Sequence, residues 1–201
     1  MRFSVYQVSR KGGREKNEDR MGYCYTRDSG LFALADGMGG HPEGEVASQL
    51  ALQTLAAMFQ RDSKPTLSDP MRFLHESIIA GHHQLLRYAT QKALIDTPRT
   101  TVVACLLQRN AAYWAHCGDS RLYMVRGDKL IARTRDHSYS ELQETMSQVV
   151  PMGERFNRNV SSPAWAARAS RWWIRSGRCG CRPVTVCCCA RMACGARSPI
   201  Q

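Results

Sequence analysis

The chain begins with alternating apolar and polar residues and changes to a helical spacing near residue 44. The alternation over residues 2–9 predicts a first strand. The apolar segments 21–26 and 31–35 flank a turn-forming Asp-Ser-Gly sequence and predict a β-hairpin. From Gly44 onward, apolar positions recur every three or four residues. They predict a helix whose buried face consists of Ala47, Leu50, Ala51, Thr54, Leu55 and Met58.

A second helix is predicted after a polar link over residues 61–68. Asp69-Pro70 suits an N-cap followed by the first helical position. The apolar positions behind this pair are Leu74, Ile78, Gly81, Leu85 and Ala89. Strands are then predicted at 101–107, 112–116, 122–125 and 130–133, followed by a short helix over 136–148. Strands, two long helices and further strands indicate an α+β sandwich.

The composition is that of a globular protein. At 201 residues, 43% of them hydrophobic, the chain is long enough for one domain with a proper core. No apolar run approaches the ~18 residues that a membrane span needs, and the first residues read as a strand rather than a signal peptide. We therefore expect a monomeric cytoplasmic protein without a membrane partner or structural disulfides. Cys24, Cys105 and Cys117 are expected to be small core side chains, and His82-His83 to lie on a solvated helix face.

The net charge of +11 is distributed unevenly and does not by itself indicate nucleic-acid binding. Residues 1–160 hold all 17 acidic side chains against 21 Lys and Arg. Residues 161–201 hold seven Arg and no acid, together with six of the nine Cys and three of the four Trp. The composition therefore divides the chain into residues 1–160 and an aberrant tail, 161–201.

The candidate chemistry lies in the first part. Asp36-Gly37 directly follows the apolar run 31–35, so a buried strand would present a carboxylate beside glycines that let carbonyls and water approach a metal ion. Taken singly, each candidate also has an ordinary structural interpretation. Asp36-Gly37 and Asp119 suit simple turns, and Arg14 with Glu18 suits a surface ion pair.

Several motifs in order decide between these interpretations. Arg14 is followed by Glu18-Asp19, then by Asp-Gly-Met-Gly-Gly-His from Asp36, Gly-Asp-Ser-Arg from Gly118, and Asp-His-Ser ending at Ser138. This order resembles the bacterial branch of the metal-dependent (type 2C) protein Ser/Thr phosphatases. The resemblance implies a four-layer αββα sandwich, in which two antiparallel sheets are flanked by helices.

The resemblance also implies roles for individual residues. Asp36 resembles the carboxylate that bridges two Mn²⁺ or Mg²⁺ ions, with the Gly37 carbonyl nearby and Glu18 and Asp19 as companions, partly through water. Arg14 resembles the phosphate-binding arginine, and Asp119 resembles a ligand of an additional, weaker metal site. Two such ions lower the pKa of a bridging water, which would attack phosphoserine or phosphothreonine of a protein substrate. A Ser/Thr kinase that the enzyme opposes is the implied partner.

Three interpretations of the tail remain. A zinc site would use cysteines whose spacing lacks paired Cys-x-x-Cys knuckles, namely Cys179, Cys181, Cys187, Cys188, Cys189 and Cys194. A basic nucleic-acid-binding tail is no better supported, and we expect no nucleic-acid partner. The third and preferred interpretation is that loss of one nucleotide near codon 160 shifted the reading frame.

The genetic code constrains this frameshift. Each original codon would be the last base of one tail codon followed by the first two bases of the next. Six letters are then forced. Trp165-Ala166 and Met192-Ala193 must give Gly, Trp172-Trp173 must give Val, Trp173-Ile174 must give Asp, and each adjacent pair within Cys187–Cys189 must give Leu. Residues 182–195 can decode as Ala-Gly-Asp-Arg-Val-Leu-Leu-Cys-Ser-Asp-Gly-Leu-Trp, and Ser-Asp-Gly is the next motif that the resemblance implies.

A shifted frame would remove carboxylates that the resemblance assigns to the second catalytic metal. It should also leave sheet edges and apolar faces uncovered. The leading function is a phosphatase. A non-catalytic remnant that binds a phosphoprotein through Arg14 and the acidic loops, and a misfolded product, are the alternatives.

Overall fold

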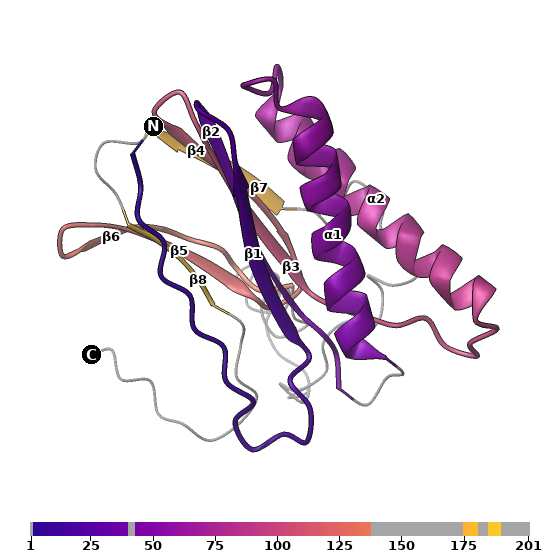
Figure 1. The fold of residues 1–201 in the computed structure, drawn as a ribbon. Coiled ribbons are helices and arrows are strands. Elements are labelled where there is room, and N and C mark those ends of the chain that lie inside the picture. The colour runs from indigo at the N-terminus through magenta and orange to yellow at the C-terminus, as the bar shows by residue number, and fades with distance from the viewer. Residues whose placement is uncertain (1, 40–42, 138–174, 181–184, 190–201) are drawn as a thin grey trace, which may run out of the picture.

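The structure is a computed structural model that describes residues 2–39, 43–137, 175–180 and 185–189. Two long helices stand between two groups of strands in the chain order (Figure 1). The elements are β1 (Asp19–Tyr25), β2 (Ser29–Asp36), α1 (Gly44–Asp62), α2 (Pro70–Gln91), β3 (Val102–Gln108), β4 (Ala111–Cys117), β5 (Arg121–Arg126), β6 (Lys129–Arg133), β7 (Arg175–Gly180) and β8 (Thr185–Cys189).

The strands form two antiparallel sheets. The five-stranded sheet has the order β1-β2-β3-β4-β7, and the three-stranded sheet has the order β6-β5-β8. Figure 1 shows α1 and α2 on one side of the five-stranded sheet and the three-stranded sheet on its other side. The α+β class is therefore confirmed. The described residues form three layers of the four-layer sandwich that the resemblance implies.

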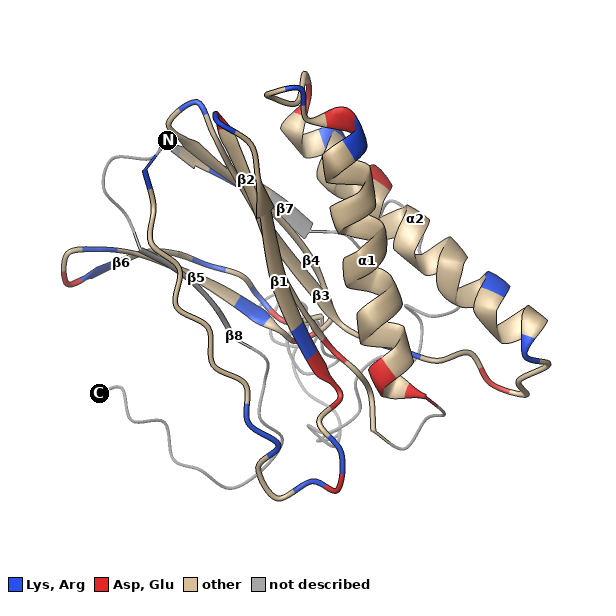
Figure 2. Cartoon of the chain, in the orientation of Figure 1, with Lys and Arg blue, Asp and Glu red and all other residues tan. Residues whose placement is uncertain are grey.

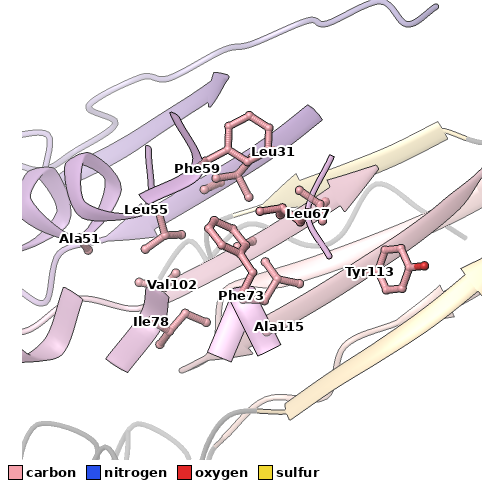
Figure 3. Packing of buried hydrophobic residues seen from close by; sticks show 14 of the residues in the cluster. Leu31, Ala51, Leu55, Phe59, Leu67, Phe73, Ile78, Val102, Tyr113 and Ala115 are labelled. Carbon is pink, nitrogen blue, oxygen red and sulfur yellow. The ribbon is translucent and has the colours of Figure 1, made fainter. Parts of the chain in front are cut away.

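Side chains along the central strands alternate between the two faces of the five-stranded sheet, and each face packs into its own hydrophobic core. Leu31, Ala33 and Ala35 of β2 pack with the helices in the cluster of Figure 3, which also contains Phe59 of α1 and Phe73 of α2. Successive strand residues point to opposite faces, so the intervening positions face the other way. They form the cluster between the sheets, with Leu34, Val103, Cys105, Ala112, Leu122 and Met124. The central strands are therefore buried on both faces.

The two helices begin where the sequence predicts. Asp69 caps α2, because its Oδ1 accepts the backbone N–H groups of Met71 and Arg72 at 3.1 and 3.0 Å. All five predicted apolar positions of α2 are buried. The buried face of α1 is rotated slightly from the prediction. It uses Gly44, Ala47, Ser48, Ala51, Leu55 and Phe59, whereas Leu50, Thr54 and Met58 are half-buried.

The predicted strand at residues 2–9 is wrong. This segment is extended but belongs to neither sheet, and its placement depends on Phe3, whose ring meets Tyr25 and Phe32 edge-on at centroid distances of 5.6 and 5.3 Å. Alternation alone does not supply a neighbouring strand, and a strand needs one for its ladder of hydrogen bonds. The short helix predicted from residue 136 is not seen at residues 136–137, and its remaining residues lie outside those described.

The expectation that the tail leaves sheet edges uncovered is also wrong at two places. β7 pairs antiparallel with β4, with Trp114 opposite Gly177, and β8 pairs antiparallel with β5. Ladder hydrogen bonds join backbone groups and depend little on side-chain identity, so an extended segment of unusual composition can still cover an open edge. The backbone of the tail thus covers one edge of the strands of each sheet, that of β4 and that of β5.

Two smaller predictions have different outcomes. His82 is buried, with 7% of its surface exposed, so its predicted solvated position is wrong, while His83 is exposed as expected. Cys105 and Cys117 are buried and Cys24 is half-buried, as expected for core side chains. Within the described part of the chain, we find no helix that is both long and apolar enough to cross a membrane.

Candidate active site

The register of β1 and β2 brings two carboxylates together. Asp19, the first residue of β1, lies directly opposite Asp36, the last residue of β2. The seven-residue pairing is continuous, so hydrophobic packing along the hairpin fixes these two polar ends beside each other. Figure 2 shows acidic residues at this end of β1 and at the beginning of α1. Like charges directly opposite each other are destabilising unless something compensates them.

The pKa of Asp36 reflects the repulsion between these carboxylates. Burial, followed by the charge and hydrogen bond of Asp19, raises the pKa of the Asp36 carboxyl to about 7. The charge of Asp119 raises the pKa further, and the guanidinium of Arg14 lowers it. Arg14 and Asp19 from the segment before β2, and Asp119 from much later in the chain, therefore act on Asp36 from within electrostatic reach.

Glycines let the chain fold tightly beside these carboxylates. Gly37 is buried, donates its N–H to the Glu18 carbonyl at 3.2 Å, and lies so close to the Gly44 carbonyl that any side chain would collide with it. A Cβ on Gly44 would lie 3.0 Å from Glu18 Oε1. The beginning of α1 thus packs directly against Glu18, and close approach to the backbone requires a glycine at position 37.

The side chains of Arg14 and Glu18 both lie close to Gly39. A Cβ on Gly39 would meet the Arg14 guanidinium and Glu18 Oε2. Arg14 is exposed, and its position depends on a loop that Asn17 closes by donating to Ser9 Oγ at 2.8 Å. The Glu18 carboxylate therefore lies beside Gly39 and Gly44, next to Arg14. Asp19 is the residue that pairs with Asp36.

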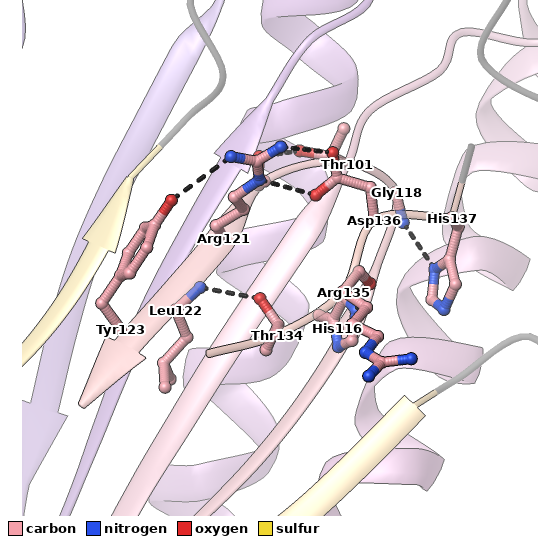
Figure 4. Close-up of polar contacts among 11 residues, drawn as sticks. Thr101, His116, Gly118, Arg121, Leu122, Tyr123, Thr134, Arg135, Asp136 and His137 are labelled. Carbon is pink, nitrogen blue, oxygen red and sulfur yellow. Dashed lines mark hydrogen bonds and ion pairs between the residues drawn. The ribbon is translucent and has the colours of Figure 1, made fainter. Parts of the chain in front are cut away.

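A network of polar groups holds the Gly118–Arg121 segment. Gly118 donates its N–H to His137 Nδ1 and accepts the His137 N–H on its carbonyl, each at 3.0 Å (Figure 4). Arg121 binds Asp136 with two hydrogen bonds of 2.7 Å, and Asp136 is only 5% exposed. This bidentate pair raises the pKa of Arg121, which stays charged.

The arrangement fits a hard divalent cation that keeps several waters. Among the described residues, no three His, Cys, Asp or Glu side chains converge closely enough to hold a metal ion. Asp19 and Asp36 nevertheless share a hydrogen bond between half-buried carboxyls, and Asp119 acts on Asp36 from further away. Carboxylate and carbonyl oxygens are the donors that Mg²⁺ and Mn²⁺ prefer, and Mg²⁺ usually retains water ligands. A cation here would relieve the repulsion that raises the pKa of Asp36.

The structure thus brings together most of the residues that the sequence singled out. Asp19 and Asp36 touch, Arg14 and Asp119 lie within reach of their charge, and Glu18 and Gly37 line the adjoining turn. Sequence reasoning missed Thr101 and Ser120, two buried hydroxyl residues beside the site. It also missed the pairing of Arg121 with Asp136, although both stand in motifs that it quoted.

Comparison with known proteins identifies the family. The profile of the family "Protein phosphatase 2C" matches residues 5–146. The Ser/Thr protein phosphatase PstP of Mycobacterium tuberculosis is 34% identical over 138 residues, which are 69% of this chain and 26% of that protein. The Ser/Thr phosphatase stp of Listeria welshimeri is 30% identical over 135 residues, 66% of this chain and 54% of that protein.

A solved structure of the catalytic domain of PstP, in complex with two manganese ions, superimposes with a TM-score of 0.63 at 26% identity. The match covers 86% of this chain and 70% of that domain. The chain spans between a quarter and about half of the length of the two curated relatives named above. Fold, motif order and sequence similarity agree, and the chain belongs to the protein phosphatase 2C family.

Proposed function

We propose that this chain carries part of the active site of a Mn²⁺- or Mg²⁺-dependent phosphatase that hydrolyses phosphoserine and phosphothreonine in proteins. The observation that carries the proposal is the opposed pair Asp19 and Asp36 with Arg14 within electrostatic reach. Two carboxylates can bind a divalent metal ion, and the nearby guanidinium of Arg14 can bind the negative oxygens of a phosphate ester. The manganese complex of the related PstP domain supports the same cofactor.

Each residue has a defined task in this proposal. Asp36 and Asp19 would hold the divalent cations with their oxygens, helped by the Gly37 carbonyl and Glu18, and Asp119 would hold a weaker ion. When bound, such ions would lower the pKa of a water that serves as nucleophile and would offer positive charge to the phosphoryl oxygens. Arg14 binds the non-bridging oxygens and keeps the phosphorus in line with the attacking water. The ester P–O bond breaks, and the products are inorganic phosphate and the free hydroxyl of the substrate.

We also infer that residues 161–201 arise from a frameshift, so that residues 1–160 are the N-terminal portion of the phosphatase domain. The codon constraints support this inference, because all six forced letters agree with the expected continuation. The tail lacks every Asp and Glu, so it brings no further carboxylate ligand. We expect a chain that binds metal weakly and turns over slowly, if the second metal depends on acidic residues encoded out of frame.

The competing function is a phosphoprotein-binding remnant without turnover. Hydrolysis of a chromogenic phosphate ester, measured with and without added Mn²⁺, separates the two. Turnover that Asp36→Asn abolishes supports the phosphatase. Phosphopeptide binding that requires Arg14, without phosphate release by the folded chain, supports the remnant. Aggregation without any Mn²⁺-dependent stabilisation would support a misfolded product.

The frameshift is tested separately by sequencing the gene around codon 160. A single inserted base should restore Ser-Asp-Gly-Leu-Trp and extend the chain, and the extended protein should turn over faster. If no single-base change restores that motif, our account of the tail is wrong. A cytoplasmic location and an opposing Ser/Thr kinase follow from the same proposal.

A further inference from the structure

One buried threonine contacts both Asp36 and the neighbours of Asp119. Thr101 donates its backbone N–H to the Asp36 carbonyl at 2.8 Å, and its Oγ1 accepts the backbone N–H of Asp36 at 3.1 Å. Backbone and side chain of one residue thus hold both main-chain polar groups of Asp36. This double contact fixes the end of β2, from which the carboxylate projects.

The same side chain reaches both residues that flank Asp119. The Thr101 hydroxyl lies 2.5 Å from Ser120 Oγ, a hydrogen-bond distance between two side chains that are 2% and 1% exposed. On the other side, a Cβ on Gly118 would lie 2.7 Å from Thr101 Cγ2, so Gly118 packs directly on the threonine methyl group. Figure 4 shows Thr101 beside Gly118. Thr101 therefore bridges the end of β2, which presents Asp36, and the loop between β4 and β5, which presents Asp119.

We infer that Thr101, through its hydroxyl contact with Ser120, is a positioning residue that sets the separation of Asp36 and Asp119. Because cation affinity depends on how far apart the carboxylates are held, Thr101 controls the affinity of this site for a divalent cation. The inference rests on the proposed function, since it takes Asp36 and Asp119 as ligands. Partners that orient metal ligands typically change affinity about 10–100-fold when they are removed.

The threonine is suited to this task by both of its branches. The hydroxyl satisfies the Asp36 N–H and Ser120 in a buried place, where an unpaired polar group would be costly. The methyl group fills the space beneath Gly118, whose φ of +106° lets the chain turn toward Asp119. Valine keeps the methyl group but lacks the hydroxyl, whereas serine keeps the hydroxyl but lacks the methyl group.

These differences define the variants. Thr101→Val should weaken Mn²⁺ binding about 10-fold, because the Asp36 N–H and Ser120 lose their partner and the loops can separate. Thr101→Ser should restore most of the affinity, since it keeps the hydroxyl. Ser120→Ala should weaken binding by a smaller factor. Adding it to Thr101→Val should change little, because the shared contact is already lost.

The matched control is a second buried hydroxyl pair, at the opposite end of the strand that carries Asp36. Ser29 at the beginning of β2 lies 2.7 Å from Ser63 Oγ, and Asp36 ends that strand. Ser29→Ala removes a comparable buried contact far from the carboxylates. We expect it to lower the melting temperature while leaving Mn²⁺ affinity unchanged.

The readout is Mn²⁺ binding to the full chain, followed by the electron paramagnetic resonance signal of free Mn²⁺ at a temperature where every variant is folded. The inference is overturned if Thr101→Val binds like the parent chain, if Ser29→Ala weakens binding equally, or if Thr101→Ser fails to restore affinity. The variant Asp36→Asn shows whether the inference about Thr101 has failed or the proposed metal site itself. If Asp36→Asn leaves binding unchanged, the metal site itself is misassigned.

Discussion

Thr101 and Asp36 exchange two hydrogen bonds at the end of β2, one through the threonine backbone at 2.8 Å and one through its hydroxyl at 3.1 Å. Asp36 is thus held by its main chain while its carboxyl remains beside Asp19. A carboxylate kept near a like charge is unstable without a cation, so stability and metal binding should be linked at this position.

Replacing Asp36 should stabilise the metal-free chain. The folded state raises the pKa of Asp36 from 3.8 to about 7, so ionisation in the native protein costs stability as pH rises through this interval. In EDTA at pH 8, Asp36→Asn should be more stable by about 1–2 kcal/mol, allowing for solvent screening at this half-buried group. Thermal unfolding at pH 6 and pH 8 measures the effect, which should shrink at pH 6.

Added Mn²⁺ should reverse that order. The parent chain should gain stability from the cation, whereas Asp36→Asn should not, because the ligand is gone. Asp128→Asn, at the exposed turn between β5 and β6, removes the same charge as a control and should behave like the parent. An Asp36→Asn chain that is less stable in EDTA, or that keeps the full Mn²⁺ shift, would contradict this account.

Two glycines should respond in opposite ways to alanine. Gly118→Ala introduces a Cβ 2.7 Å from the Thr101 methyl at a φ of +106°, and should cost about 2–4 kcal/mol. Gly81→Ala, in α2, meets Ala51 Cα at an ordinary 3.7 Å and should gain up to about 1 kcal/mol from helix propensity. Urea unfolding of both variants tests the contrast. Equal changes in the two midpoints would show that the close contact at Gly118 is misplaced.

The Arg121–Asp136 pair should matter far more than a surface pair of similar geometry. Arg121→Met leaves the buried Asp136 carboxylate uncompensated and should cost about 2–3 kcal/mol, reduced because Arg121 itself is partly exposed. Adding Asp136→Asn should recover part of the loss. Arg72 and Glu76 on α2 also lie 2.7 Å apart but are exposed, so Arg72→Ala should leave the melting temperature nearly unchanged. Similar losses from Arg121→Met and Arg72→Ala would refute the distinction.

Buried His82 should make the chain sensitive to mild acid. Burial, with a further contribution from the His83 charge, lowers the pKa of His82 below 6.5. The unfolded chain then takes up a proton that the folded chain resists, so stability falls as pH drops below 6.5. Between pH 7.5 and 5.5, His82→Gln should flatten the decrease in melting temperature. His83→Gln, at the exposed neighbour, should retain the decrease, and a parent-like slope in His82→Gln would contradict the assignment.

Periodicity and caps were sufficient to predict the hairpin, both helices and strands β3 to β6, because local patterns determine those elements. The strand at residues 2–9 was wrong because alternation does not reveal whether a partner strand exists. The burial of His82 did leave a signal. It stands four residues after Ile78 and three before Leu85, in phase with the buried stripe of α2. The polarity of the imidazole favours a surface position, whereas its place in the stripe favours burial, and burial is what the structure shows.

The site shows the same division between local and tertiary information. Asp36, Asp19 and Arg14 could be proposed from motifs that lie close together in the chain. The contact of Thr101 with Ser120 joins residues 19 positions apart, and it depends on how the end of β4 and the beginning of β5 meet β3. No local pattern determines that meeting. Motif order was therefore enough to propose the ligands, whereas the contacts of Thr101, on which the inferred positioning role rests, came only from the structure.

The central claim is that Asp36 belongs to a metal-dependent phosphoester hydrolase site, and its most direct test is turnover of p-nitrophenyl phosphate as a function of Mn²⁺ concentration. The measurement uses the frame-restored chain and its Asp36→Asn variant. We predict saturable, Mn²⁺-dependent turnover that falls at least about 100-fold in the variant, as expected when a group that organises charge at the reacting centre is lost. Equal turnover by both proteins, or no turnover by a folded frame-restored chain at any Mn²⁺ concentration, would contradict the claim.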